Sequence, residues 1–444
     1  MSTILIKNAT LINEGYQEIQ DVFIVDQFIQ EIGFNLDHKA DQIIDARGKH
    51  LIPGLIDDQV HFREPGLTHK ATIASESRAA VAGGITSFIE MPNTNPQTTD
   101  IQALENKFER AAETSLANYS FMFGGTNDNI DEIRKLDKTK VAGLKLFLGS
   151  STGNMLVDDQ AVLREIFSNT DLLISVHCED EPTVKANFAA HQEKYGEDIS
   201  IEAHPEIRSH EACYLSSSRA VSLAKETGAR LHIFHLSTAI ETGLFRNDIP
   251  LSEKKITAEV CVHHLWFSSA DYKTHGTRIK WNPAVKHQED QDALWTALND
   301  DRIDVLATDH APHTLEEKNN KYASAPSGGP LVQHALLALL TASKRGKISL
   351  EKLVQKACHN PAILFDVEKR GYIRVGYFAD LVLLDLNETT TVTPESLLYH
   401  CKWSPFEGET FQAKIESTWV NGSCVYDKGV IIENKAAKRL TFNR

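Results

Sequence analysis

Eight apolar segments, separated by stretches with a helical pattern, most constrain the fold of this chain. The segments are LIPGLIDDQVH, ITSFIEM, NYSFMFG, VAGLKLFLG, DLLISVH, ARLHIFH, KITAEVC and RIDVLATDH. Between them lie candidate helices such as HKATIASESRAAVAGG, IQALENKFERAAETSLA, DDQAVLREIFSN and HEACYLSSSRAVSLAKETGA. Alternating strands and helices predict parallel pairing, and eight such units are the number that closes an α/β barrel. We therefore predict an α/β fold, a (β/α)8 barrel of the TIM type.

The two ends of the chain have a different pattern. Residues 1–52 and 367–444 contain short alternating segments and turn residues, such as ILIKNATLI, DVFIVD and STWVNGSCVYDKG, which are typical of β-structure. We expect both ends to form one small composite β domain and residues 53–366 to form the barrel. The 444 residues of the chain suffice for both parts.

Composition excludes several classes of protein. Lys plus Arg is 46 and Asp plus Glu is 61, so the formal charge is −15, which argues against a broad surface for nucleic acid or anionic membrane. No uncharged apolar run approaches the roughly 18 residues of a transmembrane helix, and the N-terminus lacks the apolar region of a signal peptide. The 6 cysteines include no C-x-x-C pair, which indicates reduced thiols. We expect a cytoplasmic protein that binds neither nucleic acid nor membrane.

Polar residues that can bind a metal stand within or just after the predicted strands. They are Gln59, His61, Asn93, Lys145, His177, His235 and Asp309. Active sites of (β/α)8 barrels form at the carboxyl ends of the strands, because the loops converge there. One histidine at a strand end is usually an ordinary packed residue, but several at one face of a barrel are hard to explain by packing. The pattern predicts a metal site.

The motifs around these residues resemble those of the dihydroorotases, a family within the amidohydrolase superfamily. The runs DDQVHFREPG, AGGITSFIEMPNTNP, LKLFLGS, SVHCED, IFHLS, RIKWNPAVK and ATDHAPHTLEEK match the landmarks of that family in order. The resemblance covers nearly the whole chain, including the split β domain. It implies a metal-dependent cyclic amide hydrolase that interconverts N-carbamoyl-L-aspartate and L-dihydroorotate in pyrimidine biosynthesis.

The resemblance also implies the metal ligands. His61 matches the second histidine of an H-x-H motif, and Lys145 matches a lysine that is carboxylated on its side-chain nitrogen and bridges two metals. His177 and His235 match the ligands of the second metal, whereas Asp309 binds metal and acts as general acid and base. These ligands suit one or two Zn²⁺ per subunit. The implied reaction is attack of zinc-bound hydroxide on the ring carbonyl.

Lys145 also has a second interpretation. It lies within the apolar run VAGLKLFLG, where an unmodified charge would be costly to bury. Carboxylation and metal binding would remove that cost, and a buried ion pair is the alternative.

Substrate recognition is implied for a second group of residues. Arg63, Asn93 and His313 match residues that hold the exocyclic carboxylate of dihydroorotate. A guanidinium group grips a carboxylate with two parallel hydrogen bonds. Thr152, in the loop GSSTGN, and Asn282 are further candidates for contacts with the substrate. Arg63 decides the substrate class, because hydantoins, dihydropyrimidines and allantoin lack this carboxylate.

One position departs from the family pattern. The H-x-H motif is here Gln59-Val60-His61, and the amide oxygen of Gln59 is a weaker ligand for Zn²⁺ than imidazole. Three outcomes are open: a single tightly held Zn²⁺, a second and labile metal, or loss of catalysis.

Two rival functions stay open, and the first of them follows from this departure. One is a non-catalytic, dihydroorotase-like partner of aspartate carbamoyltransferase, and the other is a hydantoinase, dihydropyrimidinase or allantoinase. We favour an active dihydroorotase because only one position departs. A homodimer is the expected assembly from the prevalence of twofold symmetry, and association with aspartate carbamoyltransferase stays open. We expect the adjacent pair His263 and His264 to be structural.

Overall fold

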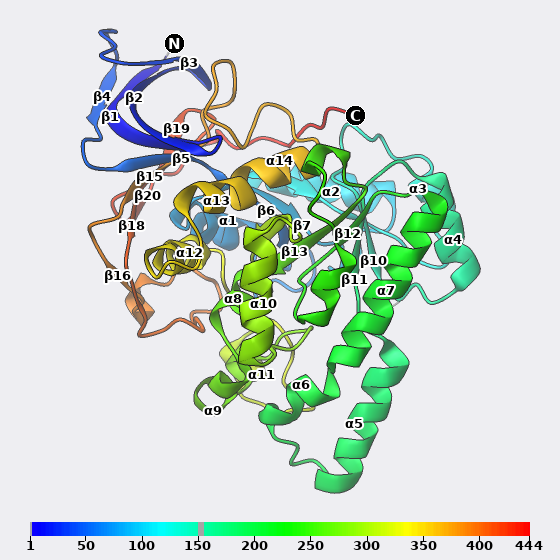
Figure 1. Cartoon of the computed structure of the whole chain (residues 1–444). Helices are drawn as coiled ribbons and strands as arrows, with labels where there is room; N and C mark the ends of the chain where they lie inside the picture. Colours follow the sequence, from blue (N-terminus) through cyan, green and yellow to red (C-terminus); the bar gives the residue numbers. More distant parts are fainter. Residues whose placement is uncertain (1, 150–154) are drawn as a thin grey trace.

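The computed structural model describes residues 2–149 and 155–444. Eight apolar segments of the sequence each contribute parallel strands to a barrel (Figure 1). These strands are β6 (Leu55–Val60), β7 (Ile85–Glu90), β8 (Asn118–Phe121) with the short β9 (Phe123–Gly124), β10 (Leu144–Phe147), β11 (Ile174–His177), β12 (Leu231–Ile233), β13 (Ile256–Cys261) and β14 (Val305–Ala307). The predicted (β/α)8 architecture is therefore confirmed.

Hydrogen bonds between the two barrel sheets close the ring. One sheet has the order β6-β7-β8 and the other the order β14-β13-β12-β11-β10-β9. The sheets join where the Ala142 amide donates to the Phe121 carbonyl at 3.4 Å. They join again where the His61 amide donates to the His310 carbonyl at 2.7 Å. Residues at the ends of β6 and β14 are thus held side by side.

Helices cover the outside of the barrel (Figure 1). The four helical segments that the sequence predicts contain α1, α2, α4 and α7. The helices are α1 (Ile73–Ala82), α2 (Ile101–Thr114), α3 (Ile130–Ile133), α4 (Gln160–Asn169), α5 (Glu181–Tyr195), α6 (His204–Ile207), α7 (His210–Thr227), α8 (Val262–Trp266), α9 (Tyr272–His275), α10 (Gln288–Asn299), α11 (Leu315–Lys318), α12 (Ala335–Lys344), α13 (Leu350–Val354) and α14 (Asn360–Leu364).

Side-chain caps and an apolar face explain why α2 forms where it does. The Asp100 carboxylate accepts a hydrogen bond from the Ala103 amide at 2.8 Å and satisfies one free donor of the first turn. Leu104, Phe108 and Ala111 recur at helical spacing and are buried against the barrel. The same kind of cap begins α1 and α7, at Thr72 and Ser209.

Strands from the N-terminal and C-terminal regions form one nine-stranded sheet beside the barrel (Figure 1). Its members are β1 (Thr3–Asn13), β2 (Tyr16–Val25), β3 (Phe28–Gly33), β4 (Gln42–Asp45), β5 (His50–Pro53), β15 (Leu381–Asp385), β18 (Lys414–Val420), β19 (Ser423–Asp427) and β20 (Val430–Ile431). β5 and β15 pair antiparallel, with Leu51 opposite Leu383, and so join the two ends. A separate hairpin consists of β16 (Thr390–Thr391) and β17 (Thr410–Phe411). The domain boundaries after residues 52 and 366 stay predictions.

A cluster of apolar side chains fills the barrel at one end. Buried side chains of the strands cluster there with residues of the C-terminal tail, namely Ile56, Ile89, Met122, Ala142, Leu173, Phe234, Val305, Leu440 and Phe442. The tail is held by hydrogen bonds between its backbone and Tyr119. The last residues therefore pack on the barrel rather than in the nine-stranded sheet. No described helix is long and apolar enough to cross a membrane.

Candidate functional site

The predicted site residues meet in one cavity of about 670 Å³ at the carboxyl ends of the barrel strands. Its wall contains Gln59, His61, Arg63, Asn93, Lys145, His177, His235, Asn282, Asp309 and His313. Thr152 lies outside the described residues. The loops and strands that carry these side chains are far apart in the sequence, so the barrel alone brings them together.

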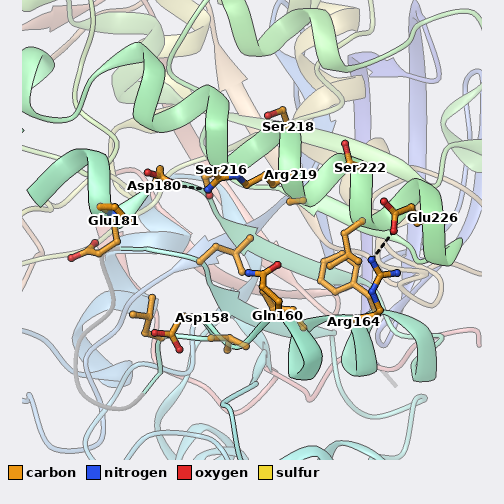
Figure 2. Close-up of a pocket in the computed structure, with 18 of the residues that line it drawn as sticks. Asp158, Gln160, Arg164, Asp180, Glu181, Ser216, Ser218, Arg219, Ser222 and Glu226 are labelled. Carbon is orange, nitrogen blue, oxygen red and sulfur yellow. Dashed lines mark hydrogen bonds and ion pairs between the residues drawn. The ribbon is translucent and has the colours of Figure 1, made fainter. Parts of the chain in front are cut away.

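A second cavity, of about 770 Å³, lies on the outside of the barrel between α4, α5 and α7 (Figure 2). Several of its charged side chains are already paired with one another. Asp180 contacts Arg219 at 2.6 Å, and Arg164 contacts Glu226 at 2.8 Å. None of the predicted site residues that the structure describes lines it, so we assign the chemistry to the smaller cavity.

His61 and Asp309 form one half of the candidate metal site. His61 Nδ1 donates to the Asn93 amide oxygen at 2.8 Å, which leaves Nε2 as the ring nitrogen with a lone pair. Nε2 lies 3.2 Å from the Asp309 carboxylate. A lone pair facing a carboxylate is repulsive until a cation or a proton lies between them. This geometry fits a shared metal, with Asn93 as the partner that orients the ring.

His177 and His235 form the other half. His177 Nδ1 lies 3.1 Å from His235 Nε2, and the rings meet edge to face. His177 Nε2 donates to Glu179 at 2.9 Å, so its Nδ1 lone pair faces the second ring. Burial favours a protonated Glu179, but Arg208 and His177 outweigh it and hold the pKa of this carboxyl below its usual range. The two ring nitrogens are therefore placed to bind one cation.

Glu179 was not foreseen in the sequence, although SVHCED places it two residues after His177. A carboxylate that accepts from a metal-binding imidazole fixes the tautomer of the ring. The sequence did contain a signal for this contact: Glu179 lies two residues after His177, which places both side chains on the same face of the chain just beyond the strand end.

Lys145 lies between the two halves of the candidate metal site and lines the same cavity. Its side chain is 1% exposed, and Nζ stands 4.1 Å from the centroid of the Phe234 ring. Among residues 2–149 and 155–444 it has no hydrogen bond and no ion pair within 4.0 Å, so the buried ion pair considered above is not found there. Burial lowers the pKa of this amine to about 7. A neutral amine is the form that reacts with carbon dioxide to give a carbamate, because it has a free lone pair.

Basic side chains cluster at the mouth of the cavity. Arg63 Nε donates to the Pro312 carbonyl at 3.0 Å, and Nη2 lies 3.0 Å from His313 Nε2. Lys70 Nζ lies 3.0 Å from His313 Nδ1 and pairs with Glu317 at 3.0 Å. Burial holds the pKa of His313 well below its usual range, so Arg63 and Lys70 carry the positive charge. Lys70 was missed in the sequence, although it follows HFREPG closely.

Three site residues adopt the left-handed backbone conformation that favours glycine. The φ angles are 68° at Arg63, 41° at His235 and 49° at Asp309. Such a conformation costs of the order of 1–3 kcal/mol in a residue with a side chain. It persists here because the barrel holds each strand end, and it aims the side chain into the cavity.

The remaining candidates lie nearby. The Asn282 amide oxygen accepts from the Ser327 hydroxyl at 2.9 Å. Gln59 lines the cavity, but its amide oxygen lies 3.7 Å from Cys261 Sγ, so its role as a ligand stays a prediction. The pair His263 and His264 lies in α8 rather than in the preceding strand.

Both histidines of that pair have structural contacts. His263 stacks on Trp281 with 4.3 Å between the ring centroids, and His264 donates to the Pro283 carbonyl at 3.1 Å. Neither lines the cavity.

A model of the amidohydrolase family matches residues 50–425. The chain belongs to the amidohydrolase family. A dihydroorotase of Halobacterium salinarum is 35% identical over 415 residues, which cover 92% of this chain and 94% of that protein. An allantoinase of Desulfitobacterium hafniense is 31% identical over 445 residues, or 98% of each chain. The L-hydantoinase of Arthrobacter aurescens has a similar structure, with a TM-score of 0.94 at 28% identity over the whole of both chains.

Membership of this family indicates that the cavity is a metal-dependent catalytic site. Amidohydrolases depend on metal, and this one carries two close pairs of metal-competent side chains on either side of a buried lysine. The same barrel also carries a basic cluster at the entrance to that site. The first feature is suited to hydrolysis and the second to binding an anion.

Proposed function

We propose that this amidohydrolase is a dihydroorotase, which reversibly closes N-carbamoyl-L-aspartate to L-dihydroorotate with loss of water. Dihydroorotases from several organisms are 33–35% identical to it over more than nine-tenths of the chain. The observation that carries the proposal is the contact of Arg63 with His313, with Lys70 beside them, at the cavity mouth. These groups offer a binding site for the carboxylate that distinguishes dihydroorotate from uncharged cyclic amides.

We propose that Asp309 moves the proton in this reaction. In the hydrolytic direction it accepts a proton from the attacking water and delivers it to the ring nitrogen as the amide bond breaks. In ring closure the transfers run in reverse. Burial raises the pKa of the Asp309 carboxyl to about 7, against the opposing effect of Lys145 and His177.

The proposed cofactor is Zn²⁺, one or two ions per subunit. When bound, it would polarise the substrate carbonyl and lower the pKa of a water molecule. His61 and Asp309 would hold one ion, His177 and His235 the other, and Lys145, carboxylated on its amine, would bridge them. The 3.1 Å between the nitrogens of His177 and His235 is compatible with both binding one Zn²⁺ at roughly 2.0–2.1 Å.

The substrate class is tested by comparing three cyclic amides on variants of Arg63. Loss of two charge-assisted hydrogen bonds, each about 1.5–3 kcal/mol, predicts that Arg63→Met lowers kcat/KM for dihydroorotate by about 10²–10⁴. Hydantoin and allantoin, if turned over at all, should be little affected. Arg164→Met, in the outer cavity, is the matched control and should behave as wild type.

Two results would contradict the proposal. One is faster turnover of hydantoin or of allantoin than of dihydroorotate, which would favour a hydantoinase or an allantoinase, respectively. The other is the absence of carbamoyl-aspartate cyclisation at any added Zn²⁺, together with stable binding to aspartate carbamoyltransferase. That combination would favour the non-catalytic partner, and metal content measured on the same sample would show whether Zn²⁺ is bound.

The location, oligomeric state and possible partner of the enzyme are also proposed. We propose a cytoplasmic homodimer, because twofold symmetric dimers are the commonest soluble assemblies. Association with aspartate carbamoyltransferase is proposed as an option, since that enzyme makes N-carbamoyl-L-aspartate. Size measurement of the protein alone, and then mixed with the transcarbamoylase, tests both.

A further inference from the structure

A second group of metal-competent side chains lies inside the barrel, apart from the catalytic cavity. Asp58 of β6, His232 of β12 and Glu259 of β13 are all fully buried, at 0% exposure. One ligand atom from each lies within 4.8 Å of the other two. His232 Nε2 stands 3.4 Å from Asp58 and 3.9 Å from Glu259. None of the three lines the catalytic cavity.

The hydrogen bonds around His232 define which of its nitrogens faces the acids. The Thr257 hydroxyl donates to the Leu231 carbonyl at 3.2 Å. Its oxygen is therefore the acceptor for His232 Nδ1–H, at 2.9 Å. In the neutral ring, Nε2 then has no hydrogen and points a lone pair at the two carboxylates.

The acids also have unused acceptor atoms. Glu259 Oε1 accepts from the His235 amide at 3.0 Å and from the Cys261 thiol at 3.2 Å, which leaves Oε2 free. Glu259 Oε2, both carboxylate oxygens of Asp58 and His232 Nε2 are buried without a hydrogen-bond partner among the described residues. Buried polar atoms are normally satisfied, so four orphaned atoms around one point indicate a missing ligand.

Charge identifies the class of that ligand. Two buried carboxylates without compensation are costly, and a lone pair between them adds to the repulsion. The position thus attracts positive charge, and one divalent cation would neutralise both acids.

We propose that Asp58, His232 and Glu259 bind a divalent transition-metal ion, at a site separate from the catalytic one. One imidazole nitrogen and two carboxylate oxygens suit Zn²⁺ or Mn²⁺. The bond from His232 to Thr257 is the orienting contact that such ligands generally have. Glu259 also links this site to the catalytic one, because its second oxygen holds the backbone of His235. The inference does not depend on the identity of the substrate.

The experiment counts and locates Zn²⁺ in the whole protein. Wild type, Asp58→Asn and Asp304→Asn are purified with Zn²⁺ in the medium, and metal per chain is measured by mass spectrometry. Asp304 is an equally buried acid paired with Lys254 at 2.7 Å, so its variant controls for loss of a buried carboxylate. Asp58→Asn should lose about one equivalent of Zn²⁺ relative to both wild type and the control.

A catalytic-site variant separates the two sites. The double variant His177→Asn and His235→Asn should retain the interior ion while losing metal from the cavity. Crystals of wild type grown with Zn²⁺ should show an anomalous scattering peak roughly 2.0–2.2 Å from His232 Nε2 and from both acids. This peak shows whether a metal ion binds to Asp58, His232 and Glu259, even where Asp58→Asn fails to fold.

Three outcomes would overturn the inference. They are an anomalous map with no peak at these side chains, equal Zn²⁺ content in wild type and folded Asp58→Asn, and a His232 imidazole protonated on both nitrogens by ¹⁵N NMR. The last would mean that His232 is an imidazolium between two carboxylates and that a proton, not a metal, holds the cluster together.

Discussion

The buried ion pair of Glu90 and Lys107 supports the strand end that carries the site. Lys107 Nζ lies 2.9 Å from Glu90 Oε2, and both side chains are at most 2% exposed. Glu90 Oε1 accepts from the Phe62 amide at 3.0 Å, and Phe62 lies between His61 and Arg63. Changing Lys107→Met would leave the Glu90 carboxylate buried without a cation.

The expected cost follows from the burial of the pair. Removing one partner of a buried ion pair destabilises a protein by about 3–5 kcal/mol. Unfolding entropy of roughly 2.1 cal/mol/K per residue gives about 0.9 kcal/mol/K for 444 residues. Lys107→Met should therefore lower Tm by roughly 3–5 °C if the chain unfolds in one step. Glu90→Gln combined with Lys107→Met should recover much of this, because an amide oxygen still accepts from Phe62.

Scanning calorimetry of the single and double variants measures the effect. Lys135→Met is the control, because its ion pair with Glu132 is on the surface and should contribute less than about 1 kcal/mol. A Tm of Lys107→Met within about 1 °C of wild type would refute the reasoning. It would mean that Glu90 is protonated in the folded protein, consistent with burial raising the pKa of this carboxyl.

Three further changes test the site and its supports. Gln59→His adds an imidazole to the cavity wall and should lower the Kd for Zn²⁺ on the order of tenfold, as measured by competition with a chelator. An unchanged Kd would mean that residue 59 is not a metal ligand. Burial raises the pKa of the Asp290 carboxyl, but the hydrogen bond from His210 outweighs burial, so that the pKa is lowered overall. The Asp290 carboxylate therefore stabilises the folded protein at pH values above the pKa that Asp290 has in the unfolded chain. The Tm difference between wild type and Asp290→Asn should accordingly shrink as pH falls from about 5 to 3, and a constant difference would contradict it. Gly66 has a φ of 85°, and a Cβ there would lie 1.9 Å from the Asn95 carbonyl oxygen. Gly66→Ala should therefore lower the free energy of unfolding by about 1–3 kcal/mol, as measured by thermal unfolding, and an unchanged Tm would contradict this.

The barrel, and the gathering of the candidate site residues in one cavity, could be predicted because both depend on local pattern. Strand and helix alternate along the chain, and residues at strand ends of a closed barrel must share one face. His61, His177, His235 and Asp309 therefore followed from their places after apolar runs. Lys145 was also noted within its apolar run, but only the resemblance suggested its carboxylation and its role as a bridging ligand.

Contacts between distant elements could not be predicted in this way. Regular alternation in β6 puts Asp57 and Gln59 on one side and Asp58 on the other. The pairing of β6 with β7 is irregular at Leu55 and again between Asp57 and Val60. Asp58 therefore faces other strands inside the barrel while Gln59 still lines the cavity. The contacts of Lys70 with His313 and of Glu179 with Arg208 likewise depend on the paths of loops, which leave no periodic signal.

The pairing of β5 with β15 has a consequence for synthesis of the chain on the ribosome. Leu51 and Leu383 are partners across about 330 residues of sequence. At roughly 5–20 residues per second, the hydrogen-bonding edge of β5 waits on the order of 15–70 s for its partner to be made. The whole barrel is synthesised during this interval. The strands β1, β2, β3 and β5 can pair first, but the exposed edge of β5 is open to other chains until β15 is made, so this edge can promote aggregation during expression.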